Sequence, residues 1–215
     1  DLKDSGMETE PAKMMFSEIE RIERLLKQLL MHSHPMPIKS QSFNLHELLD
    51  TVLSFERSSH PGLRFTAYYD ASLPDIEADR DKLHQVFLNL VRNASEACPA
   101  DGRVRVLTRH CAHWELAGTN LDPTRRYILV SIEDEGPGIP EELRKNIFKP
   151  LFSTKKQGTG LGLSISFRLV ESHGGQLRYQ PSERSGACFQ VILPGSQSET
   201  LEENSSNFVY QDLRK

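Results

Sequence analysis

Two asparagines, Asn89 and Asn93, lie four residues apart in a segment with the apolar periodicity of a helix. At this spacing both amides point to the same side of the helix, whose other face is apolar. An amide oxygen is a neutral, hard ligand of the kind that Mg²⁺ accepts beside substrate phosphates. We expect Asn93 to bind the metal ion and Asn89 to hold a metal-bound water or a phosphate. The alternative is the polar edge of an ordinary helix.

A second block, Asp134 to Ile139, follows the apolar run 128–132 and contains Gly136 and Gly138. A carboxylate at the end of a strand can accept the exocyclic amine of adenine. The two glycines would let the backbone approach the base without an intervening Cβ. Taken alone, the block is typical of a simple turn.

A third block spaces three glycines by two, at Gly158, Gly160 and Gly162, directly before a predicted helix. Free backbone amides and a helix N-terminus are typical of a phosphate site. The spacing is not that of a dinucleotide fingerprint, and no Gly-Lys-Ser/Thr follows as in a Walker loop.

The segment 148–157 lies between these two blocks and has the composition of a loop that closes over a polyphosphate. Phe148 and Phe152 precede Thr154 and Lys155, and we expect the Lys155 ammonium to reach a γ-phosphate. An exposed loop with two anchoring aromatic side chains is the alternative.

The elements that must position these blocks follow from hydrophobic periodicity and turn residues. Asn44 is expected to cap a helix that runs through Val52, with Glu47 at the capping-box position. Strands paired mostly by hairpins, with helices between them, predict an α+β fold: a two-layer α/β sandwich with a mixed, mostly antiparallel sheet covered by helices. The other expected helices are 79–97, 141–148 and 161–173, and the expected strands are 63–69, 103–110, 127–133, 176–179 and 188–193.

Composition limits the class of protein. The 215 residues are 37% hydrophobic and carry a net charge of −4, which allows one good core and gives no basic field for nucleic acid. Cys98, Cys111 and Cys188 are widely spaced, so neither a disulfide framework nor a structural zinc site is expected, and the compartment is predicted to be reducing. No apolar run is long enough to cross a bilayer. The chain starts without Met or a signal pattern, as expected of a piece of a longer protein.

Both ends of the chain are predicted to lie outside the catalytic core. Residues 15–30 have a narrow apolar seam, typical of a helix in a dimeric bundle, although packing back on the same domain is the alternative. We expect a helical arm at 1–35, a linker at 36–42, a catalytic domain at 43–194 and a polar, flexible tail at 195–215.

As a set, the four blocks resemble the N, G1, F and G2 boxes of the ATP-binding domain of bacterial sensor histidine kinases, which share a fold with the Hsp90, type II topoisomerase and MutL ATPases. The lid 150–155 and the lead-in 73–79 are similar to the nitrogen-regulation branch of these kinases. The resemblance covers about residues 43–194.

The resemblance implies that ATP and Mg²⁺ are the cofactors, that Asn93 coordinates the ion and that Asn89 helps to position it. It implies that Asp134 binds the adenine amine, and that His84 and Lys155 lie near the γ-phosphate, although a solvated His84 is the alternative. The expected cofactor-binding residues are Asn89, Asn93, Asp134, Gly136, Gly138, Ile139, Phe148, Phe152, Thr154, Gly158, Thr159, Gly160, Leu161, Gly162 and Leu163.

The implied reaction moves the γ-phosphoryl group of ATP to a histidine and then to an aspartate of a response-regulator receiver domain. It further implies a homodimer in the full-length protein and a cytoplasmic location, with membrane anchoring of the full-length protein left open. No contact with nucleic acid, and none of this fragment with a membrane, is expected.

Two departures from the family pattern stand out. The acceptor motif is absent, and neither His32 nor His34 matches it, so we expect ATP binding without efficient autophosphorylation. Ala187 replaces the hydroxyl residue often found after the glycine at 186, which predicts one lost hydrogen bond near the base.

Two alternatives to the catalytic interpretation remain. The first is a degenerate kinase that binds nucleotide and acts through a partner. The second is an ATPase driven by dimerisation, which is disfavoured because Asn89 occupies the place of the general base in that branch. Separately, His110, Cys111 and His113 are close enough in sequence to suggest a metal site, but none is expected because a fourth ligand is missing.

Overall fold

A five-stranded sheet forms the centre of the computed structural model, which describes residues 37–155, 158–182 and 186–195. Its order is β2-β4-β5-β7-β6. The first pair is parallel and the other three pairs are antiparallel, which confirms the predicted mixed sheet. The strands are β2 (Arg64–Tyr69), β4 (Arg103–His110), β5 (Tyr127–Asp134), β6 (Gln176–Pro181) and β7 (Ala187–Pro194).

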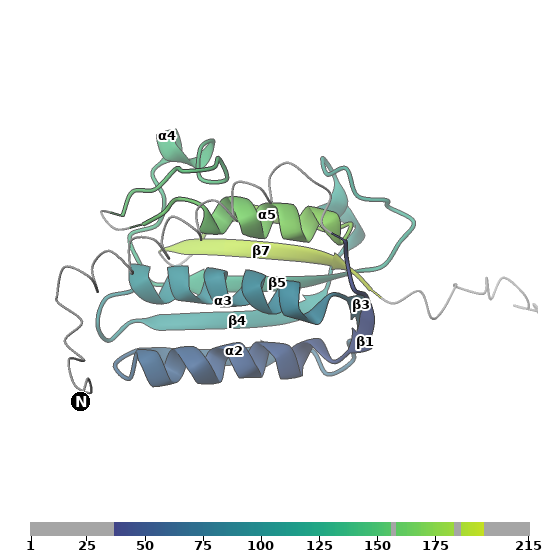
Figure 1. Ribbon diagram of the computed structural model, residues 1–215, viewed down its shortest axis with the longest axis horizontal. Helices are drawn as coiled ribbons and strands as arrows, with labels where there is room; N and C mark the ends of the chain where they lie inside the picture. Colours follow the sequence, from purple (N-terminus) through teal and green to yellow (C-terminus); the bar gives the residue numbers. More distant parts are fainter. Residues whose placement is uncertain (1–36, 156–157, 183–185, 196–215) are drawn as a thin grey trace, which may run out of the picture.

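Three helices lie next to one another across one face of this sheet (Figure 1). They are α2 (Leu45–Ser59), α3 (Arg80–Ala97) and α5 (Gly162–Ser172), with α3 in contact with both of the others. Their apolar stripes and the facing side chains of the sheet form one core, in which Phe87, Leu90 and Val130 are fully buried. The predicted two-layer sandwich is therefore confirmed.

Side-chain caps fix where two of these helices begin. The Asn44 side chain accepts hydrogen bonds from the backbone amides of His46 at 2.9 Å and Glu47 at 3.3 Å, as predicted. Asp79 accepts from the amide of Lys82 at 3.2 Å and begins α3 in the same way. Caps of this kind satisfy amides that have no partner inside the helix.

A small second sheet was not predicted. It pairs β1 (Gln41–Phe43) with β3 (Ile76–Ala78) in antiparallel register at the end of the layer of helices (Figure 1). Strands of three residues are too short to show a two-residue period, so the sequence gives no signal for them. Asp79, directly after β3, accepts a hydrogen bond from the amide of Lys39 at 3.0 Å and ties the incoming chain to α3.

The prediction of a helix over 141–148 is wrong in length, because the observed helix is shorter. The helix α4 covers only Glu141–Arg144, and the chain then continues in turns closed by bonds from the amide of Asn146 to Leu143 O at 2.8 Å and from the amide of Lys149 to Asn146 O at 2.9 Å. Each of these bonds spans three residues, which gives a tighter winding than an α-helix.

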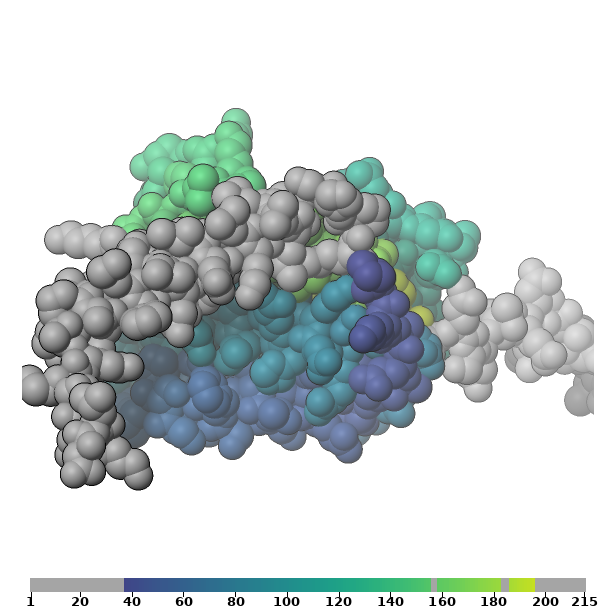
Figure 2. All heavy atoms as spheres, viewed as in Figure 1, coloured from purple at the N-terminus to yellow at the C-terminus, as the bar shows by residue number. Residues whose placement is uncertain are grey.

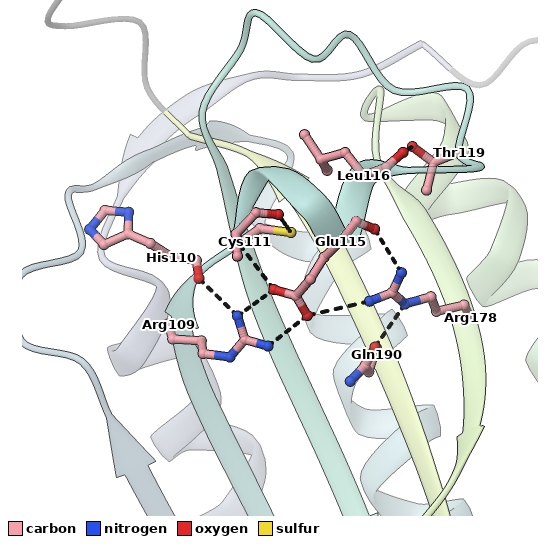
Figure 3. A network of polar contacts seen from close by, with 9 residues as sticks. Arg109, His110, Cys111, Glu115, Leu116, Thr119, Arg178 and Gln190 are labelled. Carbon is pink, nitrogen blue, oxygen red and sulfur yellow. Dashed lines mark hydrogen bonds and ion pairs between the residues drawn. The ribbon is translucent and has the colours of Figure 1, made fainter.

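The face of the sheet opposite the helices carries a second, smaller core. The 3₁₀ turn η1 (His113–Leu116), inside the connection between β4 and β5, brings Leu116 against Tyr127, Leu129 and Ile192. Beneath it, the buried Glu115 carboxylate accepts two hydrogen bonds from Arg109, at 2.5 and 2.7 Å (Figure 3). This connection is therefore anchored by an ion pair as well as by apolar contacts.

The space-filling view shows the outer surface of α2 and α3 on the helix side, with the chain around β1 covering their end (Figure 2). No helix in the described part of the chain is long and apolar enough to span a bilayer. The predicted arm at 1–35, most of the tail at 195–215 and the histidines at 32 and 34 lie outside the described residues, so these interpretations stay predictions.

Candidate functional site

Asn89 is held between α3 and the beginning of α5. Its amide nitrogen donates to the hydroxyl of the buried Ser166 at 2.9 Å. A Cβ added to Gly162 would lie 2.3 Å from Asn89 Oδ1, so the glycine leaves room for this amide. The two contacts fix the plane of the amide and place its oxygen beside the first residue of α5.

Asn93 lies one turn further along α3 and meets the loop that was predicted to be a lid. The Lys155 ammonium donates to Asn93 Oδ1 at 3.2 Å and forms an ion pair with Glu96. The structure thus brings together the predicted metal ligand and the predicted phosphate-binding lysine, across 62 residues of sequence.

Asp134 ends β5 with its side chain buried, at 2% exposure. One carboxylate oxygen, Oδ1, accepts hydrogen bonds from the backbone amides of Gly136 at 2.8 Å and Ala187 at 3.1 Å. No hydrogen bond within the described part of the chain involves the second oxygen. Asp134 is therefore oriented by backbone donors and keeps one oxygen for a ligand.

Two glycines close around Asp134 from different parts of the sequence. A Cβ on Gly136 would lie 2.6 Å from Ala97 O, and a Cβ on Gly186 would lie 2.1 Å from Asp134 O. The Ala187 amide reaches the carboxylate because Gly186 passes so close. The substitution noted at 187 leaves this hydrogen bond intact, because its donor is the backbone.

Burial raises the pKa of the Asp134 carboxyl above its ordinary value. The hydrogen bonds from Ala187 and Gly136 and the charge of Lys155 oppose this effect only in part. Before a ligand binds, the carboxylate is thus less well stabilised than a carboxylate in water. A hydrogen-bond donor such as an aromatic amine would compensate for the missing solvent.

The glycine turn before α5 also has the conformation that its sequence suggests. Gly160 has φ of +68°, and a Cβ there would lie 2.4 Å from the carbonyl carbon of Leu151. The helix begins at Gly162 without a side-chain cap, because the residue before it is Leu161. Its first amides have no acceptor within the helix, as an anion site requires.

The predicted cofactor-binding residues fall into two groups. Phe148 packs against Phe167 at 5.2 Å and Phe189 at 6.4 Å between ring centroids, and Leu161 is fully buried, so both side chains support the site from the core. Phe152, Leu163 and Ile139 are half-buried against the same core. Thr154, Gly158 and Thr159 are exposed, and Gly138 has φ of +72° beside Gly186.

His84 is half-buried on α3, five residues before Asn89. Five residues correspond to about 140° around an ideal helix, so His84 does not lie on the face of the two asparagines. Its proposed place near a γ-phosphate stays a prediction.

Three contacts of the site were not predicted: the hydroxyl of Ser166, the carboxylate of Glu96 and the amide of Ala187. Glu96 and Ser166 lie two to three residues beyond a predicted block on α3 and α5, but their partners come from elsewhere in the sequence, so only the fold makes these contacts. Among the described residues, no group of three or more His, Cys, Asp or Glu side chains could hold a metal ion, and Cys111 lies beside the ion pair of Glu115.

The geometry agrees with the comparison to known families. A family described as "Histidine kinase-, DNA gyrase B-, and HSP90-like ATPase" matches residues 78–197, more than half of the chain. The chain belongs to this ATPase family. The match begins at the end of β3 and so includes all four blocks.

Relatives of this ATPase-family chain are sensor kinases. It is 35% identical over 185 residues to the sensory histidine kinase/phosphatase NtrB of Azospirillum brasilense, covering 85% of this chain and 46% of that protein. It therefore spans about half the length of the curated relative. The resemblance to the nitrogen-regulation branch is confirmed.

Solved histidine kinases share the fold. The catalytic domain of histidine kinase ThkA is 32% identical with a TM-score of 0.62, over 73% of this chain and 96% of that domain. The complex of ThkA with the response regulator protein TrrA matches 91% of this chain and 53% of the solved chain at 29% identity, with a TM-score of 0.65. The fold of the ATPase domain of histidine kinases is thus established for this chain.

Proposed function

We propose that this chain is the ATP-binding catalytic portion of a two-component sensor histidine kinase. The observation that supports this most strongly is the convergence of Asn89 and Asn93 on α3, Lys155 on the lid and the glycine turn before α5 around one site. Asp134 supplies the recognition of adenine at the end of β5.

The residues present fit a magnesium nucleotide. An ammonium group already lies against Asn93 Oδ1, so that oxygen accepts a cation. Asn93 would hold Mg²⁺, which neutralises phosphate charge when bound, and Asn89 would help to position it through its oriented amide oxygen. The uncapped amides of α5 would bind phosphate oxygens, and Asp134 would accept the adenine amine.

In the proposed reaction the bond between the γ-phosphorus and the bridging oxygen of ADP breaks, and a bond from that phosphorus to an imidazole nitrogen forms. ADP leaves, and the imidazole loses a ring proton. The acceptor histidine lies on a separate helical hairpin, so the part of this chain is to bind, orient and neutralise charge rather than to form a covalent intermediate. Asn89 cannot act as a general base, so hydrolysis of ATP by this chain is expected to be slow.

The partners and location of the whole protein are part of the same proposal. A receiver domain would take the phosphoryl group from the histidine, and the ThkA–TrrA complex supports a partner of this class. The full-length protein would be a homodimer, with this domain in the cytoplasm, where ATP is available. The free thiols of Cys98, Cys111 and Cys188 suit that reducing compartment.

Phosphoryl transfer can be tested by supplying the missing acceptor. The chain is mixed with a separately produced dimerisation hairpin from the matched NtrB of Azospirillum brasilense and with γ-labelled ATP. We expect label on the hairpin in the presence of Mg²⁺, none on this chain alone, and loss of transfer with Asn93→Ala. Binding of ATP without transfer to any acceptor histidine would instead favour a degenerate kinase.

A further inference from the structure

The Lys155 ammonium lies between two oxygen donors on α3. One is the amide oxygen of Asn93 at 3.2 Å, and the other is the carboxylate of Glu96, with which it forms an ion pair. Asn93 and Glu96 are three residues apart and so share one face of the helix. Two side chains of α3 thus define a position for a cation.

The chemistry of this position suits a divalent ion as well as an ammonium group. An amide oxygen and a carboxylate are the hard oxygen ligands that Mg²⁺ takes when it binds together with phosphates. The lysine head is a compact positive charge and occupies the position as a substitute for the ion. Both cations cannot occupy it together, because they would repel one another at contact distance.

The ion pair is weak enough to be exchanged. The side chains of Lys155 and Glu96 are 43% and 42% exposed, so water screens the attraction between them. A dication that arrives with bound phosphates offers Glu96 a stronger partner than one solvated ammonium group does. Lys155, displaced from the carboxylate, would then be free to meet phosphate oxygens.

We propose that Glu96 exchanges cations during nucleotide binding: its carboxylate holds Lys155 beforehand and then serves the Mg²⁺ ion held by Asn93, directly or through a bound water. Glu96 is thereby a metal-positioning residue of this site, and the exchange releases Lys155 at the moment when the nucleotide arrives. This inference rests on the proposed nucleotide site.

The test is a titration of Mg²⁺ against a fixed concentration of fluorescent ADP analogue, read by fluorescence anisotropy. ADP has no γ-phosphate, so the second role of Lys155 does not enter. The variants are Lys155→Met, Glu96→Gln and the double variant, which form a cycle that separates competition from metal binding. Asp81→Asn is the control, because it removes one negative charge from the same helix about 22 Å away.

We expect Lys155→Met to lower the half-saturating Mg²⁺ concentration about threefold, because the competing ammonium is gone. When Lys155 is already Met, Glu96→Gln should raise the half-saturating Mg²⁺ concentration about tenfold. Asp81→Asn should change this concentration by less than about twofold. Circular dichroism should show the same melting temperature for all variants, since the exposed side chains changed here carry little stability.

Two results would overturn the inference. An unchanged half-saturating Mg²⁺ concentration for Glu96→Gln in the Lys155→Met background would show that the carboxylate does not serve the ion, while the nucleotide site itself stands. Failure of the unmodified chain to bind the ADP analogue at any Mg²⁺ concentration would reject the nucleotide site and this inference together.

Discussion

Asp134 combines a cost in stability with a proposed function in the recognition of adenine. Its carboxyl group is buried at the end of β5, and burial raises its pKa. The folded state therefore holds the Asp134 proton more tightly than the unfolded chain does. The stability that this group contributes is present at low pH and is lost as the pH rises through the raised pKa, which lies above the ordinary value of 3.8.

Replacement of Asp134 by Asn tests this directly, because Asn imitates the neutral carboxyl and keeps the oxygen that accepts from Gly136 and Ala187. We predict that Asp134→Asn melts at a higher temperature than the unmodified protein near pH 7, and that the difference shrinks as the pH falls toward about 4. Thermal unfolding at a series of pH values measures this difference in melting temperature, with Asp81→Asn, at an exposed position, as control. A difference independent of pH would show that the carboxyl is not strained by burial.

Gly162 is required by its neighbour rather than by its backbone conformation. A Cβ there would meet Asn89 Oδ1 at 2.3 Å and Asn89 Cγ at 3.0 Å. Gly162→Ala should therefore turn the Asn89 amide away from Ser166 and weaken Mg²⁺-nucleotide binding about tenfold, with a small change in melting temperature. Gly195→Ala is the matched control, since its nearest neighbour lies at 3.4 Å. Equal binding by both variants would argue against an oriented Asn89.

At this scale the sequence predicts the side chains that carry chemistry better than those that support them. Asn89, Asn93 and Asp134 could be chosen from residue type and spacing, and the structure brings each to a defined position. Ser166 and Glu96 could not be chosen, because an ordinary serine and glutamate on helices have no local signal. Their contacts depend on how α3 meets α5 and the lid.

Among the elements, the connection between β4 and β5 carries its own polar network on the face of the sheet opposite the helices. Glu115 accepts from Arg109 and from the amide of Ala112, and Arg178 binds both Glu115 O and the Gln190 side chain (Figure 3). The hydrogen bonds from Arg109 are the main reason that the pKa of Glu115 is lowered. The ionised Glu115 carboxylate therefore stabilises the fold at pH values above the ordinary carboxyl pKa. This contribution is lost as the pH falls through the lowered pKa of Glu115.

We predict that Glu115→Gln costs about 2 kcal/mol, the range of a charge-assisted hydrogen bond, and lowers the melting temperature by about 4–8 °C at neutral pH. The loss should diminish as the pH falls from about 4.5 through the lowered pKa of Glu115, where the folded protein takes up the proton as well. Nucleotide affinity should stay within about twofold, since Glu115 lies on the face of the sheet opposite the helices. The exposed Glu77→Gln serves as control, and a large loss of nucleotide binding by Glu115→Gln would contradict this separation.

The principal helices and strands could be predicted because each buries a periodic apolar face against the same core. The predictions miss elements, or give them the wrong length, where a segment is too short to show an apolar period. The strands β1 and β3 have three residues each, η1 has four, and α4 ends after Arg144. Tertiary contacts decide the structure of such segments, as Asp79 does when it joins the chain before β1 to α3.

For the whole molecule, two sources agree on an ATPase domain of the histidine kinase type. The four blocks meet at the helix layer of a mixed sheet, and the family match covers residues 78–197. The chain spans 46% of the matched NtrB, so the proposed phosphoryl transfer is tested with an acceptor histidine that is supplied separately.

The nucleotide site is tested by calorimetric titration of the chain with ADP and GDP, with and without Mg²⁺, beside Asn93→Ala and Asp134→Asn. We predict binding of ADP that Mg²⁺ strengthens, loss of that strengthening in Asn93→Ala, and loss of the preference for adenine over guanine in Asp134→Asn. Affinity for ADP should fall about tenfold or more in Asp134→Asn, as expected for a lost hydrogen bond to a charged group. Equal binding of ADP by the unmodified chain and both variants, or no binding at all, would rule out a magnesium-dependent adenine nucleotide site at these residues.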